Sequence, residues 1–433
     1  MTLVQNRLQP LSGNKRLIFV AITVLLAACS PKVRPVATPV KPADTPAVVV
    51  KKPVEAKRLP PPVPVISLLL PFHLNELDLS RGASRDGLAK ANLAMEYYQG
   101  FKLGLDSLTV AGESFKLQVF DTNDAAAQAH NLALNTKVRT SNVIVGPVYP
   151  EEVKSFTLAS PSLKRIIVSP LSPSTPTDYK NPNLVTMVPP LQYHCWHVAA
   201  YINNQLKAKK VFILKSGYTE DNKYIIPFKK AIDSLGKKRI KVVELTVVRG
   251  NLSALLPQLS TTGDNVFVIP ATNQQFLQVT LHSLDLLQKQ HYPVTIFGHP
   301  NWEDADYLKL ELLERLHTYI TAADKVNYKS PRVMKFLKAY RKAYRAEPGE
   351  YAIKGFDEAM YFGDIASKLS KGRYFSNNLD VALNFMTANT VLGYQDFEGL
   401  HNTFHFVALP GVGYVNTHVT LYKYTNFDLK PVE

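Results

Sequence analysis

Cysteine is almost absent from this sequence: the 433 residues contain two, Cys29 and Cys195. A chain this poor in cysteine has no disulfide framework and must be stabilised by burying a hydrophobic core. Cys195 stands beside Trp196 in an apolar, helix-like stretch. That setting favours a small buried hydrophobe over a reactive thiol, so we assign Cys195 no function.

The sequence also lacks an apolar stretch near its start that is long enough to span a bilayer. Residues 1–28 contain basic but no acidic residues, and the apolar run 17–26 is shorter than the roughly 20 residues a spanning helix needs. This pattern predicts a signal peptide over 1–28. The ending Leu26-Ala27-Ala28-Cys29 resembles the lipobox of bacterial lipoproteins, which implies cleavage before Cys29 and its acylation. The alternative is an uncleaved anchor helix with an incidental cysteine.

Sequence motifs of the common catalytic sites are missing as well. No GxSxG, HExxH, P-loop, glycine-rich dinucleotide fingerprint or CxxC occurs. The histidine pairs His194/His197 and His401/His405 have spacings that share a face on a helix or a strand, but such pairs are common by chance. We therefore predict no enzyme activity, no cofactor and no metal site.

Acidic residues are fewer than basic ones, 35 against 50, and much of the excess lies in one short segment. Residues 31–64 contain ten prolines, which rules out helix and strand periodicity. We predict that residues 29–65 form a lipidated, proline-rich tether. The milder positive charge of the remaining chain is typical of a solvated surface, and nucleic acid is not an expected partner outside the cytoplasm.

From Val65 onward, short β-branched runs alternate with helix-length segments. The predicted strands are 66–70, 116–120, 143–145, 166–169, 211–215, 240–247, 266–269 and 294–297. Apolar residues at three- and four-residue spacing predict helices around 93–108 and 333–344. This alternation indicates α/β architecture with doubly wound parallel sheets flanked by helices, and the length predicts two lobes.

Several segments resemble, in order, those of the type I periplasmic binding proteins, the leucine/isoleucine/valine-binding group. They are Ile66–Phe72, Tyr98–Asp106, Leu117–Thr122, Val143–Pro147, Ile166–Pro170 and Tyr351–Ala359. The resemblance implies two lobes joined by three crossovers, closing on a ligand between them. It places residues 66–192 plus 320–395 in an N-terminal lobe and 193–319 plus 396–433 in a C-terminal lobe.

One departure from the family pattern concerns the ligand carboxylate. In amino-acid binders a Ser or Thr follows the Gly-Pro turn and helps to hold that carboxylate, whereas here the turn is followed by Val148-Tyr149-Pro150-Glu151-Glu152. Two acids at a helix start repel a carboxylate, although they also interact favourably with the helix dipole. Standard amino-acid specificity is therefore not expected.

Ligand-contacting residues are expected where strands end at their carboxyl edge. The candidates are Phe72, Tyr149, Ser169, Ser172, Ser174, Tyr218, Asn301, Trp302 and Glu303. Of these, Tyr149, Ser172 and Trp302 are predicted to converge on one cavity. Trp302→Ala is then expected to weaken ligand binding and to leave the fold nearly as stable.

Two functional hypotheses lead, ahead of a third in which the chain is a receptor ectodomain detached from its signalling partner. The first is a lipoprotein that binds a small polar solute (an amino acid, peptide or cell-wall fragment), with an ABC transporter permease as partner. The second is a non-transport interaction module that regulates peptidoglycan synthesis, with a cell-wall enzyme as partner. In both, the membrane is contacted through the lipid on Cys29. Because Ser30 is not the aspartate associated with inner-membrane retention, the periplasmic face of the outer membrane is favoured.

Overall fold

A computed structural model of the protein describes residues 62–76, 85–371 and 396–432. The predicted signal peptide, the predicted lipidation site Cys29 and all but the last few residues of the predicted tether lie outside these ranges. Within them, no helix has both the length and the apolar character needed to cross a membrane.

The first sheet is built from both early and late segments of the chain. Its strands are β1 (Val65–Leu70), β2 (Lys116–Asp121), β3 (Val143–Val145), β4 (Ile166–Ser169), β5 (Leu184–Thr186), β13 (Phe406–Leu409) and β14 (Gly413–Asn416). Their order is β13-β14-β5-β4-β3-β1-β2, and only β13 runs antiparallel to its neighbour. Strands β1, β3, β4 and β5 are almost wholly buried, as expected where helices cover both faces of a sheet.

The second sheet repeats the order of the five central strands and differs at the edge, because β15 runs antiparallel to β10 whereas β14 runs parallel to β5. Its strands are β6 (Lys210–Lys215), β7 (Lys241–Thr246), β8 (Asn265–Ile269), β9 (Val294–Gly298), β10 (Thr318–Ala322), β15 (Thr420–Thr425) and β16 (Asp428–Pro431). The order is β16-β15-β10-β9-β8-β6-β7. Strand β15 runs antiparallel to β10, and β16 runs antiparallel to β15. The two sheets confirm the predicted α/β class, and every strand predicted from sequence is present to within one residue at either end.

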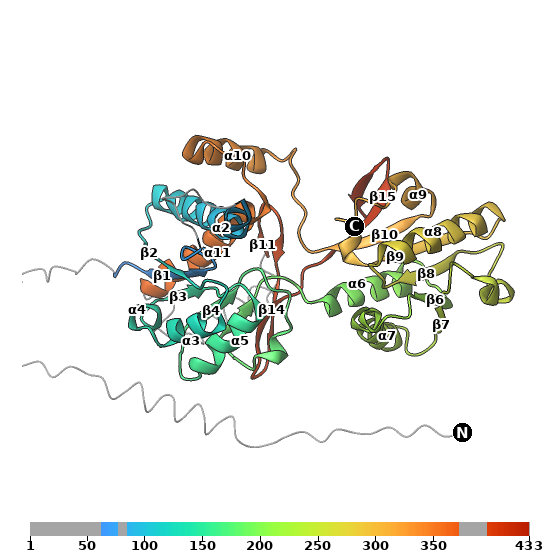
Figure 1. The fold of residues 1–433 in the computed structure, drawn as a ribbon, viewed down its shortest axis with the longest axis horizontal. Coiled ribbons are helices and arrows are strands. Elements are labelled where there is room, and N and C mark those ends of the chain that lie inside the picture. Colours follow the sequence, from blue (N-terminus) through green and yellow to red (C-terminus); the bar gives the residue numbers. More distant parts are fainter. Residues whose placement is uncertain (1–61, 77–84, 372–395, 433) are drawn as a thin grey trace, which may run out of the picture. The chain divides into compact units, whose positions relative to one another are not determined.

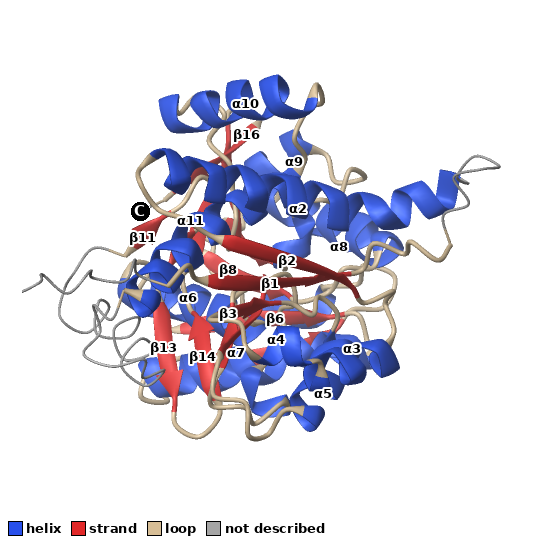
Figure 2. Cartoon of the chain, turned by 90° about the vertical axis from the view of Figure 1, so that its left-hand side faces the viewer, coloured by secondary structure: helices blue, strands red, loops and turns tan. Residues whose placement is uncertain are grey.

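Helices lie on both faces of each sheet, with one exception. They are α2 (Arg85–Val110), α3 (Ala126–Leu134), α4 (Thr136–Arg139), α5 (Pro150–Ala159), α6 (Leu191–Asn204), α7 (Asn222–Leu235), α8 (Gln274–Lys289), α9 (Leu310–Arg315), α10 (Pro331–Tyr344) and α11 (Glu350–Ser370). In the first lobe, α2 and α11 cover one face of the sheet, and α3 and α5 cover the other (Figure 2). The exception is α10, which packs on α11 and α2.

Two of the sequence segments that resembled the binding-protein family meet where α2 packs on α11. A Cβ atom at Gly100 would lie 1.8 Å from the carbonyl oxygen of Ala352, and one at Gly355 would lie 2.3 Å from that of Tyr97. Glycine is required because the two helix backbones are in direct contact. The orange α11 thus lies beside the blue α2 in Figure 1, although about 250 residues separate them in sequence.

In the described residues the chain passes between the two sheets after β5, after β10 and after β14. These passages agree with the three crossovers implied by the resemblance. The resemblance places residues 396–433 in the C-terminal lobe, and β15 and β16 do lie in the second sheet, but β13 and β14 belong to the first, where β14 pairs with β5. The second passage also comes slightly later than predicted, since β10 continues to Ala322 in the second sheet.

Candidate functional site

Both sheets share the central order 2-1-3-4-5, that is β2-β1-β3-β4-β5 and β7-β6-β8-β9-β10. In such sheets the direction of winding reverses between the first and third strands, and ligands bind at the carboxyl ends of these strands. Phe72 follows β1 and Tyr149 follows β3, so both belong to this edge of the first sheet. Tyr218 follows β6 in the second sheet.

The turn after β3 depends on glycine. Gly146 has φ of +99°, and a Cβ atom there would lie 2.1 Å from the carbonyl oxygen of Leu69. The Gly146–Pro147 peptide is cis. This turn leads directly into α5, so the amino terminus of α5 points its unpaired amides toward the carboxyl edge of the sheet.

The amino terminus of α5 is occupied by a carboxylate of its own chain. The backbone N–H of Tyr149 donates to Oε2 of Glu152 at 3.2 Å, which is the return half of a capping box. Glu152 is 1% exposed, and this burial raises the pKa of its carboxyl group. A ligand carboxylate would have to compete with this side chain for the same amides.

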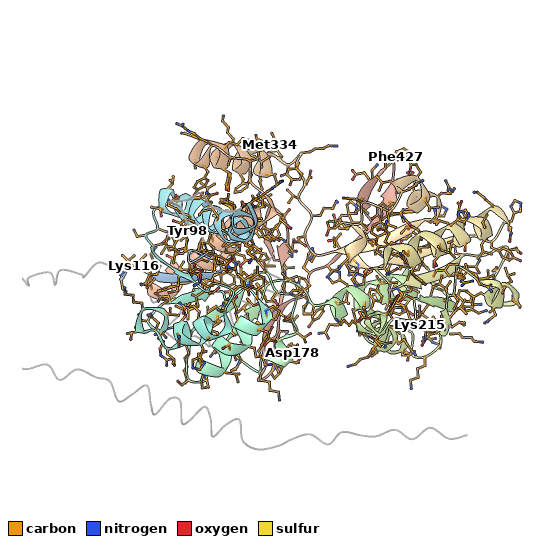
Figure 3. The ribbon with its side chains drawn as sticks, viewed as in Figure 1. Tyr98, Lys116, Asp178, Lys215, Met334 and Phe427 are labelled. Carbon is orange, nitrogen blue, oxygen red and sulfur yellow. The ribbon has the colours of Figure 1, made fainter. Side chains whose placement is uncertain are left out.

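Aromatic residues surround this edge of the first sheet. Phe72 is buried in the core and meets Tyr98 edge-on, with ring centroids 6.2 Å apart. Tyr149 and Tyr351 are partly buried against the same core. Burial, followed by the nearby carboxylates of Asp124 and Glu152, raises the pKa of Tyr149, so its hydroxyl stays protonated at neutral pH. Figure 3 shows Tyr98 on α2.

The three candidate serines lie at the end of β4 (Ser169) and in the segment just after it (Ser172 and Ser174), and their environments differ. Ser172 is buried, and its Oγ lies 2.6 Å from Oγ of Ser174. Ser169 is also buried, but its Oγ has no hydrogen-bond partner in the described residues, and the same holds for Oγ1 of Thr186, its in-register neighbour on β5. Such paired, unsatisfied hydroxyls can accept a water molecule or a polar ligand group.

Trp302 does not have the environment expected from the sequence. It is 1% exposed within the core of the second lobe, and its indole N–H donates to the carbonyl oxygen of Ala271 at 2.9 Å. The expectation of a partly packed indole that can be removed at little cost is wrong, because the turn after β9 folds the ring back onto Gly298. Tyr218, by contrast, is 62% exposed.

A cavity of about 350 Å³ lies where the crossover segments meet the second sheet. It is lined by Pro173, Val188, Pro189, Leu191, His194, His299, Pro300, Asn301, Glu303, Asp304 and residues 321–324. Two of the predicted residues, Asn301 and Glu303, line it. Pro173 comes from the segment after β4 and the rest from the crossovers and the second lobe, so the cavity combines groups from both lobes. Its volume suits a small molecule.

We call this cavity the hinge cavity. Both of the histidines that line it, His194 and His299, are neutral at pH 7. Burial lowers the pKa of His194 to about 4, helped by the nearby His299, and burial likewise lowers the pKa of His299 to about 4. Nδ1 of His194 lies 3.0 Å from the hydroxyl of Thr321. The two imidazoles therefore offer uncharged hydrogen-bonding groups to whatever occupies the cavity.

Two of the three acidic residues that line the hinge cavity, Asp324 and Glu303, are paired with lysines, and the third is the exposed Asp304. Asp324 lies 2.7 Å from the ammonium of Lys354, and Glu303 lies 2.9 Å from that of Lys325. Burial alone would raise the pKa of Asp324, but the charge of Lys354 outweighs it and the pKa is lowered. Lys354 belongs to α11 of the first lobe, so this ion pair also ties the second crossover to that lobe.

Replacing His194 with glutamine is expected to flatten the pH dependence of stability. Because the folded pKa of about 4 lies below the unfolded value of 6.5, the unfolded chain takes up the proton first and stability is lost as pH falls from 7 to 5. Urea unfolding should show wild type losing about 2 kcal/mol more than His194→Gln over this range. Parallel pH curves for the two proteins would contradict the buried, neutral state of His194.

The histidine pairs noted in the sequence have other roles in the structure. His401 Nδ1 lies 2.5 Å from the carboxylate of Asp357, and His405 Nδ1 lies 2.9 Å from that of Asp396. Across the described ranges no group of three or more His, Cys, Asp or Glu side chains is arranged to hold a metal ion. Cys195 is buried as expected, and burial raises the pKa of its thiol.

Sequence reasoning missed two residues that line the hinge cavity, His299 and Asp324, and the lysine paired with one of them. His299 directly follows β9, a predicted strand, and that position could have identified it. Asp324 follows β10, whose short run Thr318–Ala322 was not recognised as a strand. Lys354 does not line the cavity but pairs with Asp324 from α11, a segment that carried the family resemblance, and nothing in its local pattern shows that it reaches a crossover.

No protein-family model and no curated protein sequence matches this chain. Solved structures do match in fold. A putative branched-chain amino acid ABC transporter protein from Rhodospirillum rubrum aligns with TM-score 0.59 at 14% identity, covering 86% of this chain and 100% of its own. An ABC transporter substrate-binding protein from Desulfitobacterium hafniense, in complex with Leu, aligns with TM-score 0.53 at 16% identity, with the same coverage.

A protein of different function aligns equally well. The C-domain of LpoA from Haemophilus influenzae, described as a regulator of PBP1A, gives TM-score 0.54 at 13% identity and covers 85% of this chain and 100% of its own. At these identities the comparisons show the fold, which is that of the type I periplasmic binding proteins. The same fold serves solute binding in some of these proteins and regulation in another.

Proposed function

We propose that this chain, which has the type I periplasmic-binding-protein fold, is a non-catalytic envelope protein that binds a small polar solute between its two lobes. The observation that carries the proposal is the hinge cavity of about 350 Å³, lined by residues of both lobes and by two neutral histidines. A solute bound there contacts the segments that must bend when such lobes close.

The preferred solute has no free carboxylate. The backbone N–H of Tyr149, just before α5, already donates to the Glu152 side chain, and the exposed acid at the hinge cavity, Asp304, repels anions. Asn301, His194 and His299 can hydrogen-bond to hydroxyl, amide or amine groups. This chemistry fits a peptide amide or a sugar-containing cell-wall fragment better than a free amino acid.

The remaining predicted contacts are part of this proposal. Tyr149 and Ser169 do not line the hinge cavity, so their proposed contacts from the first lobe require the lobes to close on the solute and the buried Ser169 hydroxyl to become accessible. Phe72, Ser172, Ser174 and Tyr218 would form the surrounding edge. Trp302 supports the turn that carries Asn301 and Glu303, and any effect on binding would act through that turn.

We propose that the protein is anchored through a lipid on Cys29 and that the periplasmic face of the outer membrane is its location. The sequence pattern around Cys29 supports the anchor. Mass spectrometry of the amino-terminal peptide tests it directly. An unmodified Cys29 in the mature protein would contradict the anchor and leave the binding proposal intact.

A thermal-shift screen over amino acids, short peptides and cell-wall fragments tests solute binding. A ligand at about 100 times its Kd adds about 2.7 kcal/mol to the free energy of unfolding and raises the melting temperature. We expect positive results among amidated peptides and glycan fragments and none among free amino acids. A flat response across the library would contradict solute binding.

A pair of variants then locates the solute. Asn301→Ala is expected to weaken binding about tenfold, because Asn301 lines the hinge cavity and its side chain is exposed. Asn204→Ala, an equally exposed change at the end of α6 away from this cavity, is the matched control and should bind as wild type does. Equal affinities for all three proteins would place the solute elsewhere.

The second candidate function is regulation of cell-wall synthesis by direct contact with a synthase. Its specific support is the self-capped start of α5, which removes the carboxylate site that an amino-acid transporter would need. Cross-linking in cells followed by pull-down separates the two: permease subunits support the solute-transport function, and cell-wall synthases or hydrolases support regulation.

A further inference from the structure

A second cavity, of about 490 Å³, lies between α6 and α7 and is separate from the hinge cavity. Its lining is Gln192, Tyr193, Trp196, His197, Pro227, Lys230, Ala231, Ser234, Val407 and Thr417. We call it the α6–α7 groove. On each helix the lining residues lie one, three or four positions apart in sequence, so each helix contributes one continuous face.

Large apolar side chains are exposed in and beside this groove. Trp196 is 46% exposed and Val407 38%, and both line it. Ile226, next to the lining residue Pro227, is 66% exposed. Contiguous apolar exposure of this kind marks interaction sites, and exposed tryptophan and tyrosine are typical centres of protein interfaces.

Pro227 shapes the α7 side of the groove. It lies inside α7, where a proline has no N–H to donate and so leaves the carbonyl of Lys223 without its usual helical partner. The α7 face therefore presents an apolar ring next to an available backbone acceptor.

The groove combines elements of both sheets. Helices α6 and α7 pack on the second sheet, whereas Val407 lies on β13 of the first sheet and Thr417 directly follows β14. A partner seated here contacts both lobes next to the first and third crossovers. It would consequently favour one lobe arrangement over others.

The surroundings of the groove are basic. Lys230 lines it, and Lys223, Lys237 and Lys238 lie on or just after α7 and are exposed. The acidic residue of α7 is Asp233. Two copies of this chain would bring these lysines together, so the charge disfavours a second copy and favours an acidic partner.

We propose that the α6–α7 groove is a docking site for an acidic segment of a partner protein, with bulky apolar side chains inserted between Trp196 and Pro227. The site is independent of the hinge cavity and of the solute proposed to bind there. The apolar anchors fill the groove, and acidic residues beside them pair with Lys230 and its neighbours.

Panning a random 12-residue peptide display library on the immobilised full chain tests this docking site. The selected peptides are expected to be enriched in Asp and Glu together with Trp, Phe or Leu. Synthetic versions of them should bind wild type at least tenfold more tightly than Trp196→Ala or Lys230→Glu. Their affinity should also fall as NaCl is raised from about 50 to 500 mM, because salt screens the lysine charges.

Two matched variants control for nonspecific loss. Leu286→Ala removes an apolar side chain of similar exposure, 45%, on α8, and Lys338→Glu reverses an exposed charge on α10. Both should bind as wild type does. Melting curves establish that each variant is folded, and because Trp196 and Lys230 are exposed, both are expected to melt near the wild-type temperature.

Several outcomes would overturn the docking site. These are the absence of any enriched peptide, enrichment of basic or uncharged peptides, and binding that Trp196→Ala does not weaken. Self-association that depends on Trp196 in sedimentation velocity would show that a second copy occupies the groove. Trp196-dependent binding to neutral lipid vesicles would assign it to a membrane surface.

Discussion

Replacing Trp302 with alanine is expected to lower the free energy of unfolding by about 3–5 kcal/mol. The indole is 1% exposed, packs in the core of the second lobe and donates to the carbonyl of Ala271. The deletion leaves a cavity and an unsatisfied carbonyl, since Gly298 opposite the ring has no side chain to fill the space. Equilibrium urea unfolding measures the loss.

Trp196→Ala is the control for this experiment because Trp196 is the other tryptophan of the chain and is 46% exposed. It should change stability by less than about 1 kcal/mol. If Trp302→Ala were as stable as this control and instead abolished solute binding, the prediction from sequence that Trp302 contacts the ligand would be correct. The structural role assigned to Trp302 would then be wrong.

Replacing Asp357 with alanine is expected to lower the free energy of unfolding by about 3–5 kcal/mol as well. Asp357 is 1% exposed on α11, and its Oδ2 accepts from the backbone N–H groups of Leu400 and His401 and from the His401 ring. Without the carboxylate, these donors lose their partner. The backbone of His401 also binds Lys325 of the second crossover, so the loss extends to that segment.

Two further variants isolate this effect. Asp357→Asn keeps an acceptor of the same shape and should recover part of the stability, whereas Asp106→Ala removes an exposed carboxylate paired with Lys102 and should cost under about 1 kcal/mol. A loss for Asp357→Ala as small as that of Asp106→Ala would show that the network does not hold the 400–401 segment.

The strands that sequence predicted well are those with continuous β-branched or aliphatic runs. Such runs are required where helices cover both faces of a sheet, so a strand that is buried on both faces can be predicted from its local composition. Strand β5, with the residues Leu-Val-Thr, and strands β10, β13 and β14 were missed because they are short or because polar or glycine residues interrupt their apolar run. Their strand conformation depends on hydrogen-bonded pairing with a neighbouring strand of the sheet.

In the candidate site, too, some features could be predicted from the sequence and others could not. The sequence identified the turns after β1, β3, β4 and β9, because a turn after an apolar run is a local signal. It did not show which side chains of those turns face inward. Trp302 and Asn301 are adjacent in sequence, yet one is in the core and the other lines the hinge cavity.

By itself, the sequence determined the α/β class, the repeated strand and helix order, the reliance on core burial in a cysteine-poor chain, and the family likeness. The family likeness rests on a resemblance of several short segments in order, and the others follow from local composition and periodicity. The tertiary structure alone decided that β13 and β14 return to the first sheet, that Glu152 caps its own helix, and that Lys354 pairs with Asp324 across a crossover. These depend on contacts between residues far apart in the chain or on the exact geometry of a turn, and the free energy that selects them comes from groups that local sequence does not bring together.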